Sequence, residues 1–156
     1  MSKSKSGKMK DDAKRELKPK LRFPEFRDAP GWRVEPLGGV FDTTTGGTPD
    51  RSNIAFWEGT IPWITTSLIE FNIIEHAEEF ITEKGMLNSS AKMFPKDTIL
   101  IALYGQGITR GKVALLGIEA TTNQACGAIL PTKGMEPRFT FHYPVSYTHL
   151  TLPTKA

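Results

Sequence analysis

Two short apolar runs, separated by a polar glycine-rich stretch, dominate the hydrophobic pattern of this chain. Residues 98–103 and 113–118 are rich in branched aliphatic side chains and too short for independent helices, so each is predicted to be a buried strand. Between them, residues 104–112 hold three glycines, one aromatic ring, one amide, one hydroxyl and two cations. A regular strand does not have this composition. The pattern therefore predicts a β-hairpin with a long polar tip.

Two further strands are predicted around this hairpin. Residues 121–130 are apolar after a polar start and are expected to form a third strand of the same sheet. Residues 61–64 form another strand, and Pro62 places it at a sheet edge or at the start of the strand because proline lacks a backbone N–H. Most of these pairings are expected to be antiparallel.

Helical and irregular segments complete the predicted fold. Thr82 is expected to cap a short helix over residues 83–87. Residues 21–26 contain Pro24 and are predicted to be extended and held by two Phe rings. Residues 42–53 consist of turn formers and are predicted to be a polar loop. The fold class is therefore α+β, mainly antiparallel β with one or two short helices.

The net charge of +3 is concentrated at the N-terminus. Residues 1–28 hold ten Lys or Arg against five Asp or Glu, whereas the remaining residues hold ten against twelve. Residues 1–20 are predicted to be a disordered basic arm that touches phosphates without reading sequence, and a solubilising tail fits them equally well. The folded domain is expected over residues 21–142.

Candidate catalytic chemistry is sparse. His76, His142 and His149 are far apart, and none has metal-ligand spacing with another histidine or with Cys126. Residues 105–107 match no phosphate-binding glycine motif, and no motif for ATP or S-adenosylmethionine is present. An enzyme that uses Cys126 as its nucleophile is one alternative. The sequence favours recognition without catalysis, with no cofactor and no metal.

Cysteine usage and hydropathy indicate the compartment. A single cysteine excludes a disulfide framework and suits a reducing environment. No apolar run approaches the roughly 20 residues that a membrane-spanning helix needs. We therefore expect a soluble, cytoplasmic protein.

Three polar loops carry the side-chain types that contact nucleic acid. Arg and Gln pair with base edges, Lys and Thr suit phosphates, and Gly lets backbones approach closely. The loops span residues 43–53, 65–67 and 104–112. The candidate DNA-binding residues in them are Thr48, Arg51, Asn53, Thr65, Thr66, Ser67, Tyr104, Gln106, Thr109, Arg110 and Lys112.

The loop 104–112 is the strongest of these candidates. Arg110 is expected to read guanine, Gln106 adenine, and Lys112 to contact phosphate. A glycine-rich turn with solvated cations explains the same residues equally well. Five glutamates between residues 70 and 83 are expected to form an acidic side that faces away from phosphates.

A series of short motifs follows a fixed order along residues 18–142. The motifs are Leu21-Arg22-Phe23-Pro24-Glu25-Phe26, Trp32, Gly46-Gly47-Thr48-Pro49, Ile61-Pro62-Trp63-Ile64, Ile81-Thr82-Glu83-Lys84-Gly85, Pro95, residues 107–112 and Asn123-Gln124-Ala125-Cys126. Together they resemble the target-recognition domain of a type I restriction-modification specificity subunit, a component of phage defence. Motifs that recur in members with different targets are expected to maintain the fold rather than read bases, and these are Trp63, Pro95 and Asn123-Gln124.

The resemblance implies a function and a set of partners. A full subunit of that family carries two such domains joined by long helices, and each domain reads half of a split target. Methyltransferase subunits that hold S-adenosylmethionine dock on the helices, and translocase and nuclease subunits that use ATP and Mg²⁺ join them. For this chain the resemblance implies sequence-specific binding of double-stranded DNA, with catalysis and cofactors supplied by the partner subunits.

The end of the chain departs from the family pattern. Residues 143–156 contain two prolines and no heptad pattern where a long helix is expected, so we expect an artefactual tail that is foreign to the family. Without the helical spacer, docking of methyltransferase subunits on this chain is not expected. The alternative function is a β-rich module that binds glycans or small ligands through exposed aromatic rings such as Trp57, Trp63 and Tyr104.

Overall fold

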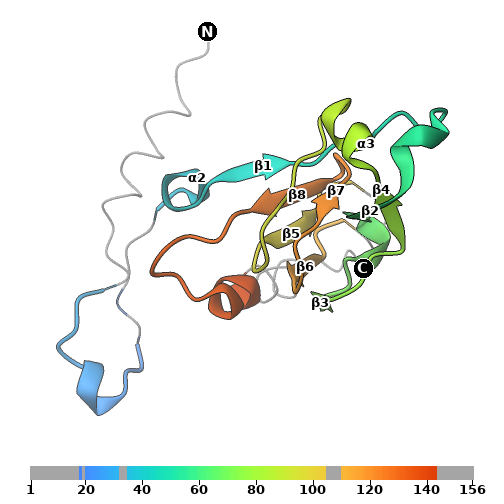
Figure 1. Cartoon of the computed structure of the whole chain (residues 1–156). Helices are drawn as coiled ribbons and strands as arrows, with labels where there is room; N and C mark the ends of the chain where they lie inside the picture. The colour runs from blue at the N-terminus through green and yellow to red at the C-terminus, as the bar shows by residue number, and fades with distance from the viewer. Residues whose placement is uncertain (1–17, 19, 32–34, 105–109, 144–156) are drawn as a thin grey trace, which may run out of the picture. The chain divides into compact units, whose positions relative to one another are not determined.

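The structure, a computed structural model, describes residues 18, 20–31, 35–104 and 110–143 (Figure 1). The chain consists of two compact units, Met1–Val40 and Phe41–Ala156. The predicted arm over residues 1–20 lies almost wholly outside the described residues. In the first unit, η1 is a 3₁₀ turn over Pro24–Phe26 and α2 is a single helical turn over Leu37–Val40.

The prediction of an extended segment held by two Phe rings is wrong. Pro24 starts η1, because a proline at the first position of a helical turn loses no hydrogen bond. Phe23 and Phe26 are 73% and 56% exposed, so neither ring holds the segment in a core.

The second unit contains two sheets, one of five strands and one of three. The five-stranded sheet has the order β1-β8-β5-β6-β3, with β1 over Thr43–Thr45, β8 over Cys126–Ile129, β5 over Ile99–Ala102, β6 over Val113–Leu116 and β3 over Ile73–Ile74. The other has the order β4-β2-β7, with β4 over Glu79–Ile81, β2 over Trp57–Ile64 and β7 over Thr121–Thr122. The pairs β2–β7 and β3–β6 are parallel and the others are antiparallel, so the predicted fold class is confirmed.

The central hairpin is confirmed. Strands β5 and β6 pair antiparallel, with Ile99 opposite Leu115. Its base is closed by two backbone bonds of 2.9 Å, from Gly111 N to Ala102 O and from Ala102 N to Lys112 O. The predicted tip falls largely on residues 105–109, which lie outside the described residues.

The prediction of one strand over residues 121–130 is wrong, because the segment forms two strands in different sheets. β7 pairs with β2, whereas β8 pairs with β5. The break falls at Asn123, whose Oδ1 accepts a hydrogen bond of 3.0 Å from Ala125 N. An asparagine that bonds the backbone two residues ahead makes a turn, which redirects the chain from one sheet to the other.

Two other predictions about strands need correction. Residues 43–45 are the edge strand β1 and not loop, because three β-branched threonines suit an extended backbone. Strand β2 begins at Trp57 and lies between β4 and β7, so Pro62 is not on an edge strand. Its partner β7 begins only opposite Trp63, one residue beyond the proline.

The short helical elements follow local capping chemistry. The predicted cap is confirmed, because Thr82 Oγ1 accepts a hydrogen bond of 3.0 Å from Gly85 N at the start of α3, Glu83–Leu87. The 3₁₀ turns η2, Ile54–Phe56, and η3, Thr66–Leu68, flank β2. Residues 137–143 are also helical.

The core lies on both faces of the five-stranded sheet. Leu100, Leu116 and Ala128 pack with Ile64 of the smaller sheet in one apolar cluster. Alternate positions such as Ile99 and Leu115 face the other way and pack with Phe141 of the C-terminal helical segment. All four residues of β6 are therefore buried, which explains why the strand reads as a continuous apolar run and not as an alternating one.

Candidate nucleic-acid interface

Three chain segments meet where strands β2, β5 and β7 end. Asn123 N, just after β7, donates to Ile64 O at the end of β2 over 3.1 Å. Leu103 N, just after β5, donates to Ala125 O over 2.9 Å. Residues 65–67, 103–104 and 123–125 are thus neighbours in space although they are far apart in the sequence.

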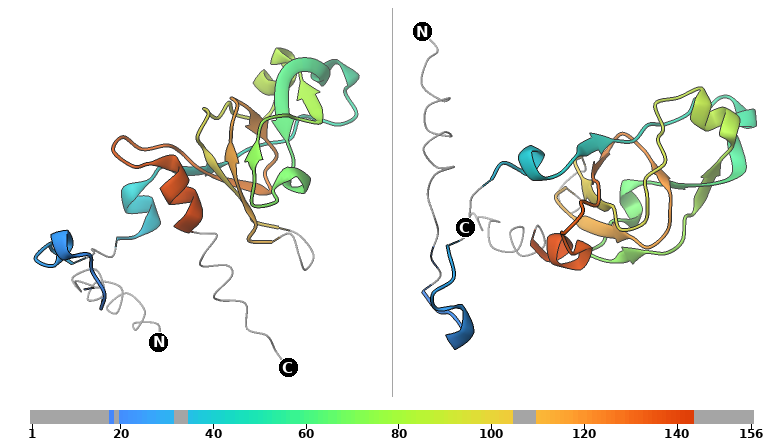
Figure 2. Two further views of the ribbon diagram at one scale, coloured as in Figure 1. Left: turned by 90° about the horizontal axis from the view of Figure 1, so that it is seen from below. Right: turned by 60° about the vertical axis from the view of Figure 1, so that its left-hand side comes forward.

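The base of the hairpin joins this group. Phe71 N donates to Val113 O over 2.9 Å, so the segment that follows η3 runs beside the start of β6. Figure 2 shows the strands of this unit from two further directions. The predicted loop 65–67 and the described ends of the loop 104–112, residues 104 and 110–112, therefore approach one another at one edge of the domain.

The loop that follows β1 reaches the same edge. Thr48 Oγ1 donates to Gln124 Oε1, and Gly47 N donates to Thr122 O over 2.8 Å. A Cβ atom on Gly46 would lie 2.0 Å from Thr122 O, so only glycine permits this approach. We call the assembled surface the loop edge; it comprises Thr48, Thr65, Thr66, Ser67, Tyr104, Arg110, Gly111, Lys112, Asn123 and Gln124.

Side chains on the loop edge differ in how much they are already engaged. Tyr104 is 67% exposed, and Arg110, Ser67 and Gln124 are exposed as well. Thr65 and Ser67 share a hydrogen bond between their hydroxyls. Gln106 and Thr109 lie outside the described residues, and their roles stay predictions.

Lys112 is bound by a partner that the sequence pattern did not suggest. Its ammonium forms an ion pair with both carboxylate oxygens of Glu70, and its side chain is only 13% exposed. Glu70 therefore lies at the loop edge and not on a separate acidic side. The pair ties the hairpin base to the segment that follows η3.

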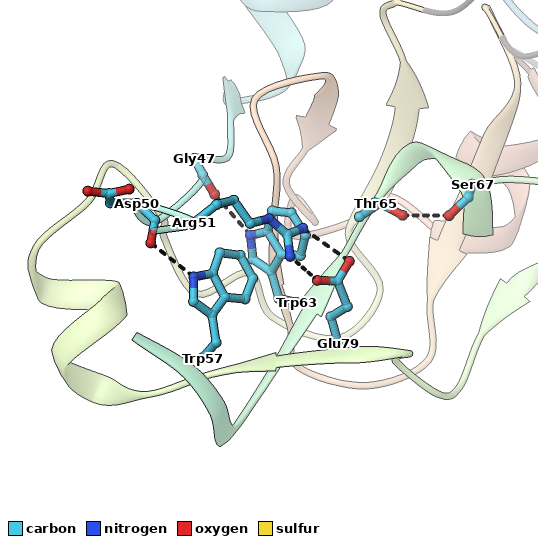
Figure 3. A network of polar contacts seen from close by, with 8 residues as sticks. All are labelled: Gly47, Asp50, Arg51, Trp57, Trp63, Thr65, Ser67 and Glu79. Carbon is cyan, nitrogen blue, oxygen red and sulfur yellow. Dashed lines mark hydrogen bonds and ion pairs between the residues drawn. The ribbon is translucent and has the colours of Figure 1, made fainter. Parts of the chain in front are cut away.

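Arg51 lies in a different environment, which Figure 3 shows, and Asn53 is engaged in a neighbouring turn. The Arg51 guanidinium forms a bidentate ion pair with Glu79, and its Cζ lies 3.8 Å from the ring centroid of Trp57 and 4.7 Å from that of Trp63. Asn53 Oδ1 caps η2 by accepting from Ala55 N over 3.2 Å. Both side chains therefore make contacts within the domain, and their predicted contacts with DNA stay predictions.

Trp57 and Trp63 both donate hydrogen bonds to the loop of residues 46–53. Trp57 Nε1 donates to Asp50 O and Trp63 Nε1 donates to Gly47 O, both over 3.0 Å, and the rings meet edge to face with centroids 5.1 Å apart. Trp63 is 2% exposed and Trp57 is covered by Arg51. The two rings therefore offer no open aromatic platform for a glycan, whereas Tyr104, the third ring of that alternative, is 67% exposed.

Arg51 should contribute measurably to stability rather than to binding. We expect Arg51→Ala to lower the free energy of unfolding by about 1 kcal/mol, because an exposed ion pair and an exposed cation–π contact each contribute less than that. Urea unfolding of Arg51→Ala, Glu79→Gln and the double variant measures the coupling. Single losses that simply add would show that the Arg51–Glu79 pair contributes nothing.

Sequence reasoning missed Gln124 as a candidate contact. Asn123 acts as the predicted fold-maker, since its Oδ1 also accepts from Cys126 Sγ over 3.3 Å. Gln124, next in the chain, is exposed at the tip of the turn between β7 and β8. A long polar side chain immediately after a turn-forming asparagine is the signal that would have found it.

Cys126 does not have the environment of a nucleophile. The thiol is fully buried in the core, and burial raises its pKa to about 12. The group is therefore protonated at neutral pH, whereas nucleophilic attack requires the thiolate. Among the described residues, no three His, Cys, Asp or Glu side chains are grouped so as to hold a metal ion. The described part of the chain also contains no helix long and apolar enough to cross a membrane.

Comparisons with known proteins agree with this architecture. The profile of the type I restriction modification DNA specificity domain family matches residues 30–152. The chain is 32% identical over 113 residues to the EcoR124I/EcoR124II specificity subunit of Escherichia coli, and 32% identical over 114 residues to the MjaIX specificity subunit of Methanocaldococcus jannaschii. Each alignment covers 71% of this chain but only 28% and 26% of the two relatives, so the chain spans less than a third of their length.

Solved structures show the same fold at lower identity. The HsdS subunit from Thermoanaerobacter tengcongensis superposes with a TM-score of 0.54 at 21% identity, covering 81% of this chain and 29% of that one. A chain from a structural study of complex assembly and conformational transition of the type I R-M system gives 0.57 at 18% identity, covering 84% and 33%. The chain belongs to the type I restriction-modification DNA specificity domain family.

Proposed function

We propose that this domain binds double-stranded DNA in a sequence-specific manner, as one target-recognition half of a type I specificity subunit. Family membership supports the class of ligand. The observation that carries the proposal is the convergence of polar loops at the ends of β2, β5 and β7, because loops on rigid strands present side chains in fixed positions.

The loop edge supplies the contacts in this proposal. Arg110 and Gln106 read bases, Tyr104 adds a ring with a hydroxyl, and Thr65, Thr66, Ser67 and Thr109 contact phosphate. The Thr48 hydroxyl already donates to Gln124 and the Lys112 ammonium is paired with Glu70, so these two side chains hold the loops in place. Arg51 and Asn53 support the loop that presents Thr48 and make no direct contact.

The distribution of charge suggests that different parts of the chain supply phosphate attraction and sequence specificity. Residues 41–143 carry eight Lys or Arg against eleven Asp or Glu, so the net charge of the domain does not attract DNA. The basic residues 1–20 supply phosphate attraction without sequence information. Specificity then comes from the loop edge.

The chemistry of restriction and modification belongs to other chains in this proposal. Methyltransferase subunits with S-adenosylmethionine, and translocase and nuclease subunits with ATP and Mg²⁺, act at the site that the specificity subunit selects. This domain holds no cofactor of its own and works in the cytoplasm, where the DNA is. Docking of those subunits requires parts of a specificity subunit beyond this domain.

The proposal is tested by selection from a randomised duplex pool with the full chain, followed by anisotropy titration of the recovered sequence and of the unselected pool. We expect the selected duplex to bind at least roughly a hundredfold tighter, because each base pair that is read contributes about 1–3 kcal/mol. Binding should also weaken as salt rises, since phosphate contacts release counterions. Equal affinity for both DNAs, or affinity that ignores salt, would contradict the proposal.

A further inference from the structure

The turn between β7 and β8 holds side-chain donors that no group in the described residues uses. Asn123 Oδ1 accepts from Ala125 N and Cys126 Sγ, and Gln124 Oε1 accepts from Thr48 Oγ1. Both amide oxygens are thus engaged within the fold. The two NH₂ groups, Asn123 Nδ2 and Gln124 Nε2, make no hydrogen bond within the described residues.

The backbone that carries these donors is held by hydrogen bonds to three neighbouring segments. Asn123 N is bonded to Ile64 O, and Ala125 O accepts from Leu103 N. Gly47 N is bonded to Thr122 O immediately before the turn. Amide donors on such a rigid support are oriented before any ligand arrives, which lowers the entropy cost of binding.

Hydroxyl donors lie next to them in the same surface. Ile64 O, which binds Asn123 N, directly precedes Thr65, and Thr65 and Ser67 share one hydrogen bond between two hydroxyls. Two hydroxyls carry two hydrogens and one of these is used in the shared bond, so one donor stays available. The turn and η3 together therefore present a row of neutral donors.

We propose that Asn123, Gln124 and the Thr65–Ser67 pair form a neutral phosphate-binding ledge that holds the DNA backbone in register while Arg110 reads bases. A phosphate oxygen only accepts hydrogen bonds, so it matches groups whose acceptors are already engaged. Amides and hydroxyls are established partners of DNA phosphates and carry no sequence information themselves. The domain has more carboxylates than cations, so few cations are left to bind phosphate. Uncharged donors can bind the DNA backbone without them.

The inference rests on the proposed function and makes a distinct prediction about salt. Neutral donors do not neutralise a phosphate and so release no counterion, whereas cationic contacts do. Gln124→Met keeps the length of the side chain and removes its donors. It should weaken binding by roughly tenfold on selected and random duplexes alike, the factor for a bond to a charged group worth about 1.5 kcal/mol. The slope of affinity against salt should stay that of the parent chain.

A second variant sharpens the test. Gln124→Glu keeps the acceptor for Thr48 and puts an anion where the donor stood, so the loss should exceed that of Gln124→Met on both duplexes. Lys133→Gln lowers the net charge by the same single unit at an exposed residue after β8, at the opposite end of the sheet from the turn, and serves as the matched control, with affinity close to that of the parent. Thermal melting of each variant verifies that the fold is retained.

Each outcome decides a separate claim. A loss at Gln124 confined to the selected duplex would overturn the ledge, because the residue would then read a base. Unchanged affinity in both Gln124 variants would also overturn the ledge. If the parent chain still selects its duplex in that case, the proposed function stays intact. A parent chain that binds no DNA would overturn both.

Discussion

Replacing Trp63 by alanine should lower the free energy of unfolding by about 3–5 kcal/mol, the usual cost of removing a fully buried aromatic side chain. Trp63 is buried with Ile81 and Ala91, and its indole N–H bonds Gly47 O. The variant loses the packed ring and leaves that carbonyl without its indole partner. Such a loss is a large part of the stability of a small domain.

Two further variants separate the ring from its hydrogen bond. Trp63→Phe keeps an aromatic ring and should cost less than the alanine variant. Trp57→Ala removes a ring that is only partly buried, so its loss of unfolding free energy should also be smaller than that of Trp63→Ala. Urea unfolding measures all three, and a loss below about 1 kcal/mol for Trp63→Ala, the level typical of ordinary substitutions, would show that the loop does not depend on this anchor.

Arg110→Ala should cost about 1–3 kcal/mol of binding free energy on the selected duplex and much less on random DNA, because a bidentate Arg–guanine pair discriminates by that amount. Arg110 is exposed, two residues before a lysine that Glu70 already holds. Its guanidinium therefore lies beside a fixed hairpin base and is free to enter a groove. The melting temperature should stay unchanged, since an exposed side chain away from special features contributes little to stability.

The matched control for Arg110 is Lys133→Ala, which removes the same charge. Lys133 follows β8, whose last residue pairs with the first residue of β5, so it lies at the opposite end of the sheet from the loop edge. Its loss should not change the sequence preference. Gln106→Ala, predicted from the sequence alone, should show the same selective loss for adenine. If both Arg110→Ala and Gln106→Ala keep the preference of the parent, base reading moves to the loop around Arg51 and Asn53 or to residues 65–67.

Local signals in the sequence predicted the elements that depend on local chemistry. The apolar runs of β5 and β6 and the cap at Thr82 were readable because burial and capping leave marks within a few residues. The same holds for the polar loops, whose glycines and hydroxyls identified most of the loop edge.

Features that depend on residues far away in the sequence could not be predicted from local patterns. The pairings Arg51–Glu79 and Lys112–Glu70 join residues 28 and 42 positions apart, so a cation that looked free in the sequence is bound in the fold. The division of residues 121–130 between two sheets depends on the parallel partner β2, which no periodicity within the segment reveals. Gln124 was assigned to the fold because its motif recurs in family members with different targets. That recurrence does not reveal which of its atoms face solvent.

The closed base of the central hairpin has a consequence for how new specificities arise. Two backbone bonds at Ala102 and the Lys112–Glu70 ion pair fix both ends of the tip, so residues can be inserted or exchanged between them without disturbing the sheet. Lengthening a loop whose ends are already held adds little closure entropy, about 0.6 kcal/mol for each doubling. Under the proposed function, a lineage or a protein engineer can therefore change the target by replacing one short surface segment while the core sequence stays the same.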